Sequence, residues 1–291
     1  MSDTKRQHYV PQFYLRQFED KDGFLWVYDK RDKKEFKCRS ENICQEKLLY
    51  ETKWENADEN LGKYVLFNDI EHLFSEKEGK YAQVVSRVLK VCTPQQKKNV
   101  LICSSDEKKL LAEFAVNLYV RNPWIMKVFE LDHIPEELEG NQELQAMREV
   151  FSQLGFGNMD SLVKAIQKKA FMSDGFDRGF CVELTERLRH VELTFFYSTD
   201  SAFATSSFPS GLEEDDETLS AFLSLSPNVA VIFGNFNCLH NFRNRMMRIE
   251  KDKVMEFNKN IVNLSAAQVR YIICRNESLL RELIQQRKSE E

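Results

Sequence analysis

The hydrophobic pattern changes character twice along the chain, and this change limits the folds that the chain can form. Over residues 58–189 most apolar side chains recur at spacings of three, four and seven, which is typical of amphipathic helices. The segments on either side, 24–50 and 193–233, hold short aromatic and β-branched runs, which favour strands. We therefore predict an α+β fold, with a mostly helical middle and a small antiparallel sheet formed by the N-terminal hairpin and the strands of the C-terminal half.

Proline and capping residues delimit the predicted helices. Thr93-Pro94 ends the first helical stretch, because proline cannot continue a helix. Ser105, followed by charged residues, is the expected N-cap of the next helix. Ser265 and Gln268 match a capping box that opens the last helix. The predicted helical segments are 58–91, which holds two helices, then 105–121, 136–154, 160–171, 178–189 and 265–286.

Short runs of strand-forming residues mark the expected strands. A polar turn at 29–34 joins the first two strands into a hairpin. The predicted strands are 24–28, 35–39, 42–50, 193–198, 203–205, 221–225 and 229–233. The chain has only 10 Gly and 6 Pro, and it contains no repeat or low-complexity linker. We therefore predict one continuous domain over residues 1–291.

Composition excludes several classes of protein. Lys and Arg number 41 against 46 Asp and Glu, which excludes a general basic coat for nucleic acid or anionic lipid but leaves room for a local basic patch. The longest apolar runs are far shorter than the ~20 residues that span a membrane, and the polar N-terminus differs from a secretory signal. The seven scattered cysteines include no Cys-x-x-Cys pair. We predict a cytoplasmic protein with reduced thiols and no membrane segment.

The most informative segment is His-Tyr-Val-Pro-Gln-Phe-Tyr-Leu-Arg-Gln-Phe at residues 8–18. Val10 is expected to be extended, because the residue before a proline avoids the helical region. Pro11 can then occupy the first position of a short helix, on which Phe13, Tyr14 and Phe18 share one face. His8 would lie just ahead of this helix, where it can reach into a cleft.

This segment closely resembles the signature of the family called domain of unknown function 4238, whose bacterial and fungal members begin with a His-Tyr-Val-Pro motif. The later motifs of the family are matched in order by 70–78, 117–123, 203–209, 225–227 and by Asn260 or Asn263. The resemblance covers nearly the whole chain but implies no particular reaction. One departure is Ser207, which stands where the family usually has Asp. If that Asp is a metal ligand or a base in the relatives, either Asp200 or another carboxylate takes its place here, or the activity is lost.

His8 and Glu71 are the first two candidate catalytic residues. An imidazole titrates close to neutral pH, so His8 suits proton transfer or metal ligation, and its alternative role is to pin the N-terminal segment. Glu71 lies beside the apolar residues Ile70 and Phe74, which predicts a partly desolvated carboxyl group. A carboxylate and a histidine can bind a divalent cation or form an acid–base pair. The alternative for Glu71 is a solvated helix face.

Arg121 is the third candidate catalytic residue, at the end of a largely apolar helix. Its guanidinium can clamp a phosphate through two parallel hydrogen bonds, or it can bind the last carbonyl groups of its own helix. Arg16 has the same two possibilities. A basic run after residue 242 can contact a phosphate backbone or form a solvated surface. The full set of candidate substrate-binding residues is Tyr14, Arg16, Asn117, Thr205, Ser206, Arg243 and Arg245.

These residues favour a nuclease or related phosphodiesterase of a bacterial conflict or defence type. No Gly-x-Ser-x-Gly elbow, phosphate-binding Gly-rich loop or His-Glu-x-x-His motif is found, which disfavours serine hydrolases, P-loop enzymes and zincins. The expected partner is a nucleic acid or nucleotide, and a divalent cation is the candidate cofactor. The alternative is a ligand-sensing or protein-binding module without catalysis. The sequence leaves the oligomeric state open.

Overall fold

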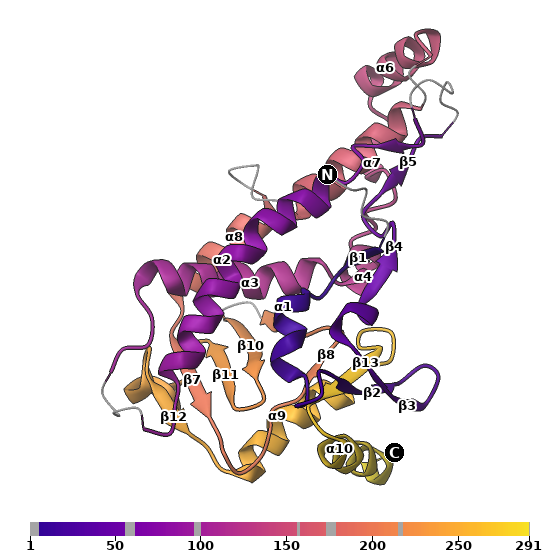
Figure 1. The fold of residues 1–291 in the computed structure, drawn as a ribbon. Helices are drawn as coiled ribbons and strands as arrows, with labels where there is room; N and C mark the ends of the chain where they lie inside the picture. The colour runs from indigo at the N-terminus through magenta and orange to yellow at the C-terminus, as the bar shows by residue number, and fades with distance from the viewer. Residues whose placement is uncertain are drawn as a thin grey trace.

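The computed structural model describes residues 6–55, 62–95, 100–155, 158–172, 179–214 and 218–290. Most of the strands lie in the lower part of the molecule, and the helices α6 (Gln142–Gln153) and α7 (Met159–Met172) extend from it as an arm (Figure 1). The largest hydrophobic core lies between the helices of the middle and the strands of the C-terminal half. This arrangement confirms the predicted α+β fold.

The larger sheet has five strands in the order β12-β7-β11-β10-β9. They are β7 (Leu193–Tyr197), β9 (Gly211–Glu214), β10 (Leu219–Ser226), β11 (Val229–Phe233) and β12 (Met246–Arg248). All neighbours are antiparallel except β12 and β7, which are parallel. Every residue of β7 is buried, because helices cover one face of the sheet and a second hydrophobic cluster covers the other.

The smaller sheet has four strands in the order β3-β2-β13-β8 and joins the two ends of the chain. They are β2 (Leu25–Asp29), β3 (Lys34–Cys38), β8 (Thr205–Ser206) and β13 (Tyr271–Cys274). The predicted N-terminal hairpin is therefore confirmed, and it pairs with strands of the C-terminal half as expected. The C-terminal strands are divided between two sheets. Helices α9 (Lys251–Asn263) and α10 (Glu277–Glu290) pack together beside the smaller sheet.

The long helix α2 (Asp69–Val91) and the helix α3 (Ser105–Val120) pack next to the N-terminal segment, and they carry Glu71 and Asn117, with Arg121 directly after α3. α3 begins with a capping box in which the Ser104 hydroxyl accepts from Glu107 N and the Glu107 carboxylate accepts from Ser104 N. The N-cap is therefore Ser104, one residue before the predicted position. The other helices are α1 (Gln12–Leu15), α4 (Pro123–Val128), α5 (Glu136–Glu139) and α8 (Phe180–His190).

Two of the predicted helices are wrong in part. The stretch 58–91 forms one helix that begins at Asp69, because Tyr64–Val65 pairs as strand β6 with β5 (Thr52–Lys53). Asn68, with φ of 61°, turns the chain between this strand and the helix. Residues 58–61 of the predicted segment lie outside the described residues. The stretch 136–154 is divided into α5 and α6, because Gly140 ends the first and Asn141 caps the second.

The predicted helix over 265–286 is also wrong in part, for a different reason, since only its residues from Glu277 onward are helical. Ser265 and Gln268 do exchange the hydrogen bonds of a capping box, with Gln268 N donating to Ser265 Oγ at 3.3 Å and Ser265 N donating to Gln268 Oε1 at 3.1 Å. The chain then makes a turn, enters β13 and starts the last helix only at Glu277. A capping box alone therefore does not commit the chain to a helix. The helix α9 was not predicted.

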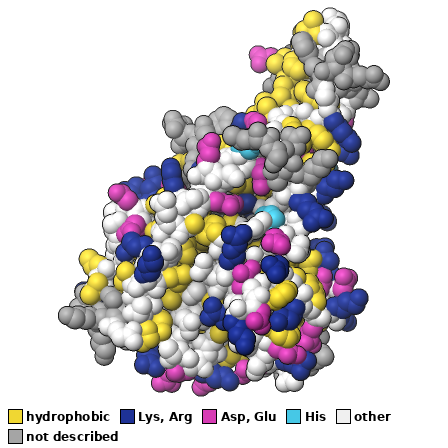
Figure 2. All heavy atoms as spheres, viewed as in Figure 1, with side chains coloured by type: hydrophobic (Ala, Val, Ile, Leu, Met, Phe, Trp, Pro, Cys, Tyr) yellow, Lys and Arg dark blue, Asp and Glu magenta, His cyan; other side chains and the backbone are white. Residues whose placement is uncertain are grey.

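The arm carries several exposed apolar side chains. Figure 2 shows hydrophobic atoms gathered over this part of the molecule, on α6 and α7. The most exposed of these side chains belong to Met147, Val150, Leu154 and Ile166. All seven cysteines are free. In the described part of the chain, no helix is both long and apolar enough to cross a membrane.

Candidate functional site

The N-terminal motif enters the molecule as a strand and continues as a short helix. Strand β1 (Arg6–His8) pairs with β4 (Gln45–Lys47), and Tyr9 N donates to Cys44 O at 3.0 Å. The chain then reaches Pro11, which stands directly before α1 as the N-cap residue. The predicted short helix is confirmed, but Pro11 stands directly before its first residue and does not form it.

The aromatic residues of the motif anchor this helix in the core. The rings of Phe13 and Tyr14 lie 5.4 and 5.8 Å from that of Phe114 on α3, and Tyr14 also contacts Phe18 at 5.4 Å. The Tyr14 hydroxyl and Thr205 Oγ1 are 2.6 Å apart, and both side chains are buried. Tyr14 and Thr205, which we expected to bind substrate, are thus bonded to each other.

Arg121, at the C-terminal end of α3, is the centre of a buried polar network. Its side chain is only 1% exposed, and its guanidinium lies 4.2 Å from the centre of the Phe74 ring. Its guanidinium donates to Glu78 Oε1 (2.7 Å), Asn117 Oδ1 (3.3 Å), the main-chain oxygen of His8 and Tyr50 Oη (3.4 Å). A guanidinium has five N–H groups, so too few remain for the two parallel bonds of a phosphate clamp.

Glu71 on α2 belongs to the same neighbourhood but is not bonded to Arg121. Its Oε2 atom is buried and has no hydrogen-bond partner among the described residues. The pKa of Glu71 is raised from 4.5 to about 7, chiefly by burial; the charge of Arg121 opposes the shift, and the carboxylates of Glu78 and Glu51 add to it. Near neutral pH this carboxyl group is therefore divided between its acid and its base form, as proton transfer requires.

The raised pKa of Glu71 predicts how the stability of the protein depends on pH. Between about pH 4.5 and 7 the folded protein keeps the proton that the unfolded chain has released, so the free energy of unfolding falls as the pH rises. Glu71→Gln should remove this fall. The measurement is urea unfolding of both proteins at pH 5 to 8. We expect the free energy of unfolding of the variant, relative to that of the wild type, to increase from pH 5 to about pH 7 and then to stay constant.

A matched control for this experiment is Glu76→Gln, since Glu76 lies exposed on the same helix. This variant should follow the pH dependence of the wild type. If the free energy of unfolding of Glu71→Gln changed with pH in the same way as that of the wild type, this result would contradict the raised pKa of Glu71.

His8 lies on the other side of Arg121 and is half-buried. Burial lowers its pKa below the ordinary value of 6.5, the hydrogen bond to Glu41 opposes the shift, and Arg121 lowers the pKa further. The imidazole is therefore neutral at pH 7. Its Nε2 lies 3.3 Å from the main-chain oxygen of Glu41. The tautomer that donates this bond leaves the lone pair of Nδ1 as an acceptor.

Arg16 is the exposed cation beside His8. Its Nη2 donates to Gln12 Oε1 at 3.1 Å, and Gln12 Nε2 lies 3.5 Å from His8 Nε2. Arg16 forms no ion pair with a carboxylate in the described part of the chain. Of the two arginines that the sequence offered as a phosphate clamp, Arg16 is the one with free donors.

The sequence did not single out four polar residues that complete the network. Gln7 is fully buried and donates to Glu51 Oε1 at 2.6 Å, while its Oε1 accepts from Tyr50 N at 2.9 Å. Asn68 N donates to both carboxylate oxygens of Glu51 at 3.2 Å. The signal for Gln7 was its place next to His8 in the motif, but its partners lie 43 and 44 residues away.

The other predicted binding residues have structural partners. Asn117 accepts from Arg121, and Ser206 Oγ accepts from Phe208 N at 3.0 Å. Arg243 pairs with Glu192, and Arg245 Nη1 donates to Asn241 O at 3.4 Å. No hydrogen bond or ion pair between described residues connects these two arginines to His8, Glu71 or Arg121.

Ser207, at the position where the resemblance to the family led us to expect Asp, has structural partners. Its Oγ accepts from the main-chain N–H groups of Arg270 and Tyr271 at 2.9 and 3.0 Å, at the start of β13. Its main-chain oxygen accepts from Asn122 Nδ2 at 3.0 Å. Asp200, the alternative carboxylate, instead lies at the surface. Among the described residues, no three His, Cys, Asp or Glu side chains are placed to hold a metal ion.

Comparison with known proteins gives a family but no described activity. A family model described as "Protein of unknown function (DUF4238)" matches residues 6–278, which is nearly the whole chain. Neither a curated protein nor a solved structure matches the chain.

Proposed function

The chain belongs to the DUF4238 family of proteins of unknown function, and we propose from its geometry that it hydrolyses phosphodiesters, as a nuclease does, with His8 and Glu71 transferring the protons. One observation carries this proposal. Both groups interact with the charge of the same buried arginine, and the pKa of His8 is lowered while that of Glu71 is raised to about 7. Two neighbouring groups with pKa values shifted in opposite directions are typical of an acid–base site.

In this proposal each group has one role. The neutral His8 accepts a proton from the attacking water through Nδ1, and the protonated Glu71 gives a proton to the leaving oxygen. Arg16 contacts the phosphate. Arg121 is a positioning residue, because it holds the main-chain oxygen of His8 and makes no contact available to a substrate.

The charges beside His8 support an anionic substrate. Arg6 on β1 and Lys47 on β4 are direct cross-strand partners, and both are exposed. Two like charges at opposed positions destabilise a pair of strands, and a bound polyanion would relieve this repulsion. These two residues place positive charge on the strands next to His8, in a chain whose net charge is −5.

A cleavage assay tests the proposal. Purified protein is mixed with labelled RNA, single-stranded DNA and duplex DNA, in parallel with Mg²⁺, Mn²⁺ and EDTA. We expect cleavage of at least one substrate, and activity in EDTA would exclude a required divalent cation. No cleavage of any substrate under any condition would contradict the proposal.

The N–H groups of Arg121 are largely occupied by bonds within the protein, and this observation favours a second candidate function, a binding module without catalysis. In this function the same buried network only shapes the protein, and a ligand binds elsewhere on it. A gain in melting temperature with a nucleotide, without turnover, would support this function over hydrolysis. A role in bacterial conflict or defence stays a prediction.

A further inference from the structure

A cleft lies beside Tyr9, in the segment between β1 and α1. Its volume is about 240 Å³. The lining residues come from the hairpin turn, the start of α4, the segment after β8 and the loop before β13. Those that matter for its chemistry are Tyr9, Arg31, Trp124, Lys127, Ser207 and Arg270. We call it the Tyr9 cleft.

Two of the three cations that line the Tyr9 cleft have no carboxylate partner among the described residues. Arg31 and Lys127 are exposed, and within the described ranges neither forms an ion pair with a carboxylate. Arg270 is fixed in place, since its Nε and Nη2 both donate to Asp29 Oδ2 at 3.0 Å. Glu46 is the single carboxylate among the described lining residues. Two free cations are thus held beside an ordered guanidinium, as in sites for phosphate.

One wall of the Tyr9 cleft is flat and apolar. Trp124 is half-buried, and its ring packs against that of Phe208 at 6.2 Å, so its position is fixed. Tyr9 is 5% exposed, and its pKa is raised well above 10 by burial, so its ring stays uncharged. Pro123 adds a further rigid apolar surface. Aromatic side chains of this kind stack with the bases of single nucleotides.

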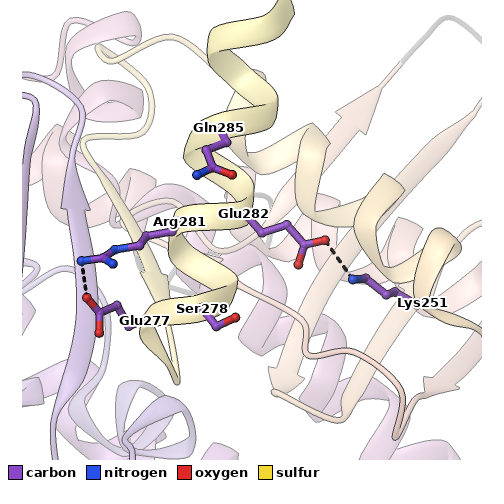
Figure 3. A pocket seen from close by; sticks show the side chains of 6 residues that line it. All are labelled: Lys251, Glu277, Ser278, Arg281, Glu282 and Gln285. Carbon is purple, nitrogen blue, oxygen red and sulfur yellow. Dashed lines mark ion pairs between the residues drawn. The ribbon is translucent and has the colours of Figure 1, made fainter.

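A groove beside α10 has the opposite character. It is larger, about 520 Å³, and Figure 3 shows its charged side chains facing one another. Lys251 pairs with Glu282 at 2.9 Å, and Arg281 pairs with Glu277 at 2.5 Å. Both cations of this groove are therefore paired with carboxylates of the protein itself. The Tyr9 cleft, in contrast, keeps free cations next to an aromatic wall.

We propose that the Tyr9 cleft binds a nucleoside monophosphate, with the phosphate against Arg31 and Lys127 and the base against Trp124. The volume is slightly below the roughly 300–1,000 Å³ of pockets for drug-sized ligands, so it suits one nucleotide better than several. The nucleotide is either a free molecule or the end of a nucleic acid chain. This site goes beyond the proposed hydrolysis, because none of its residues takes part in proton transfer there.

Calorimetric titration of the full chain with 5′-AMP tests the site. Adenosine and inorganic phosphate, each titrated alone, should bind at least about tenfold more weakly, since each lacks one half of the contacts. Binding of AMP should quench the fluorescence of Trp124, and Trp124→Phe should remove this quenching while Trp26 and Trp54 remain. A 5′-phosphorylated dinucleotide identifies the source: equal affinity to AMP indicates a chain end, and much weaker binding indicates a free nucleotide.

The double variant Arg31→Ala/Lys127→Ala should weaken AMP binding by about tenfold or more. A matched control is Lys80→Ala/Lys90→Ala, which removes two exposed cations from α2 and should leave the affinity unchanged. Absence of AMP binding, or equal affinity in the double variant and the wild type, would overturn the proposal. His8→Ala should bind AMP normally, so failure of this site and failure of the proposed hydrolysis are distinguishable.

Discussion

Replacement of Arg121 by methionine is expected to lower the free energy of unfolding by about 3–5 kcal/mol, the cost of removing one partner of a buried ion pair. The guanidinium is 1% exposed and binds groups from three parts of the chain. Methionine fills much of the same space but leaves Glu78 and the main-chain oxygen of His8 without their donor. Urea unfolding monitored by circular dichroism measures the change.

Two further variants separate charge from geometry. Arg121→Lys keeps the positive charge but cannot reach four acceptors, so it should recover only part of the lost stability. Arg16→Met removes an exposed cation of the same motif and should change the free energy of unfolding by less than about 0.5 kcal/mol. If Arg121→Met were as stable as Arg16→Met, Arg121 would not be the centre of the buried network.

Replacement of His8 by alanine is expected to lower the rate of phosphodiester cleavage by about 10²- to 10⁴-fold, the usual contribution of a general base. The fold should remain, because Arg121 binds the main-chain oxygen of His8, which alanine retains. The measurement is the initial rate of cleavage of the best substrate, together with the circular dichroism spectrum of the variant.

His72→Ala serves as the control, since His72 is an exposed histidine on α2. It should cleave at the rate of the wild type. His8→Ala with full activity would remove the imidazole from the mechanism, whereas loss of activity together with loss of the spectrum would assign His8 a structural role. His8→Asn keeps a polar side chain of similar reach. If this variant recovers the spectrum but not the activity, the imidazole itself is required for cleavage.

Local sequence patterns correctly predicted those elements whose conformation depends on residues that are close together in the chain. The hairpin of β2 and β3 follows from two strand-forming runs and a polar turn, and the short helix after Pro11 follows from the preference of proline for the start of a helix. The same reasoning failed at Ser265, where the capping-box bonds form but β13 follows. Pairing of β13 with β2, more than two hundred residues away in the chain, overrides the local preference there.

The candidate site was predictable only as a set of residues. Three separate segments of the sequence pointed to His8, Glu71 and Arg121, and in the structure Arg121 binds the main-chain oxygen of His8 and interacts with the charge of Glu71. Their partners were not predictable, since Glu78 and Tyr50 lie 43 and 71 residues from Arg121 in the chain. Arginine at a helix end can bind a ligand or the protein itself, and only the three-dimensional contacts distinguish these roles.

The pH dependence of cleavage by the wild type and by Glu71→Gln tests the central claim most directly. With His8 as base and Glu71 as acid, the wild-type rate should rise as His8 loses its proton below pH 6.5 and fall as Glu71 loses its proton near pH 7. Glu71→Gln should be slower, and its remaining activity should no longer fall above pH 7. A fall above pH 7 that persists in Glu71→Gln would contradict the assignment of Glu71 as the acid.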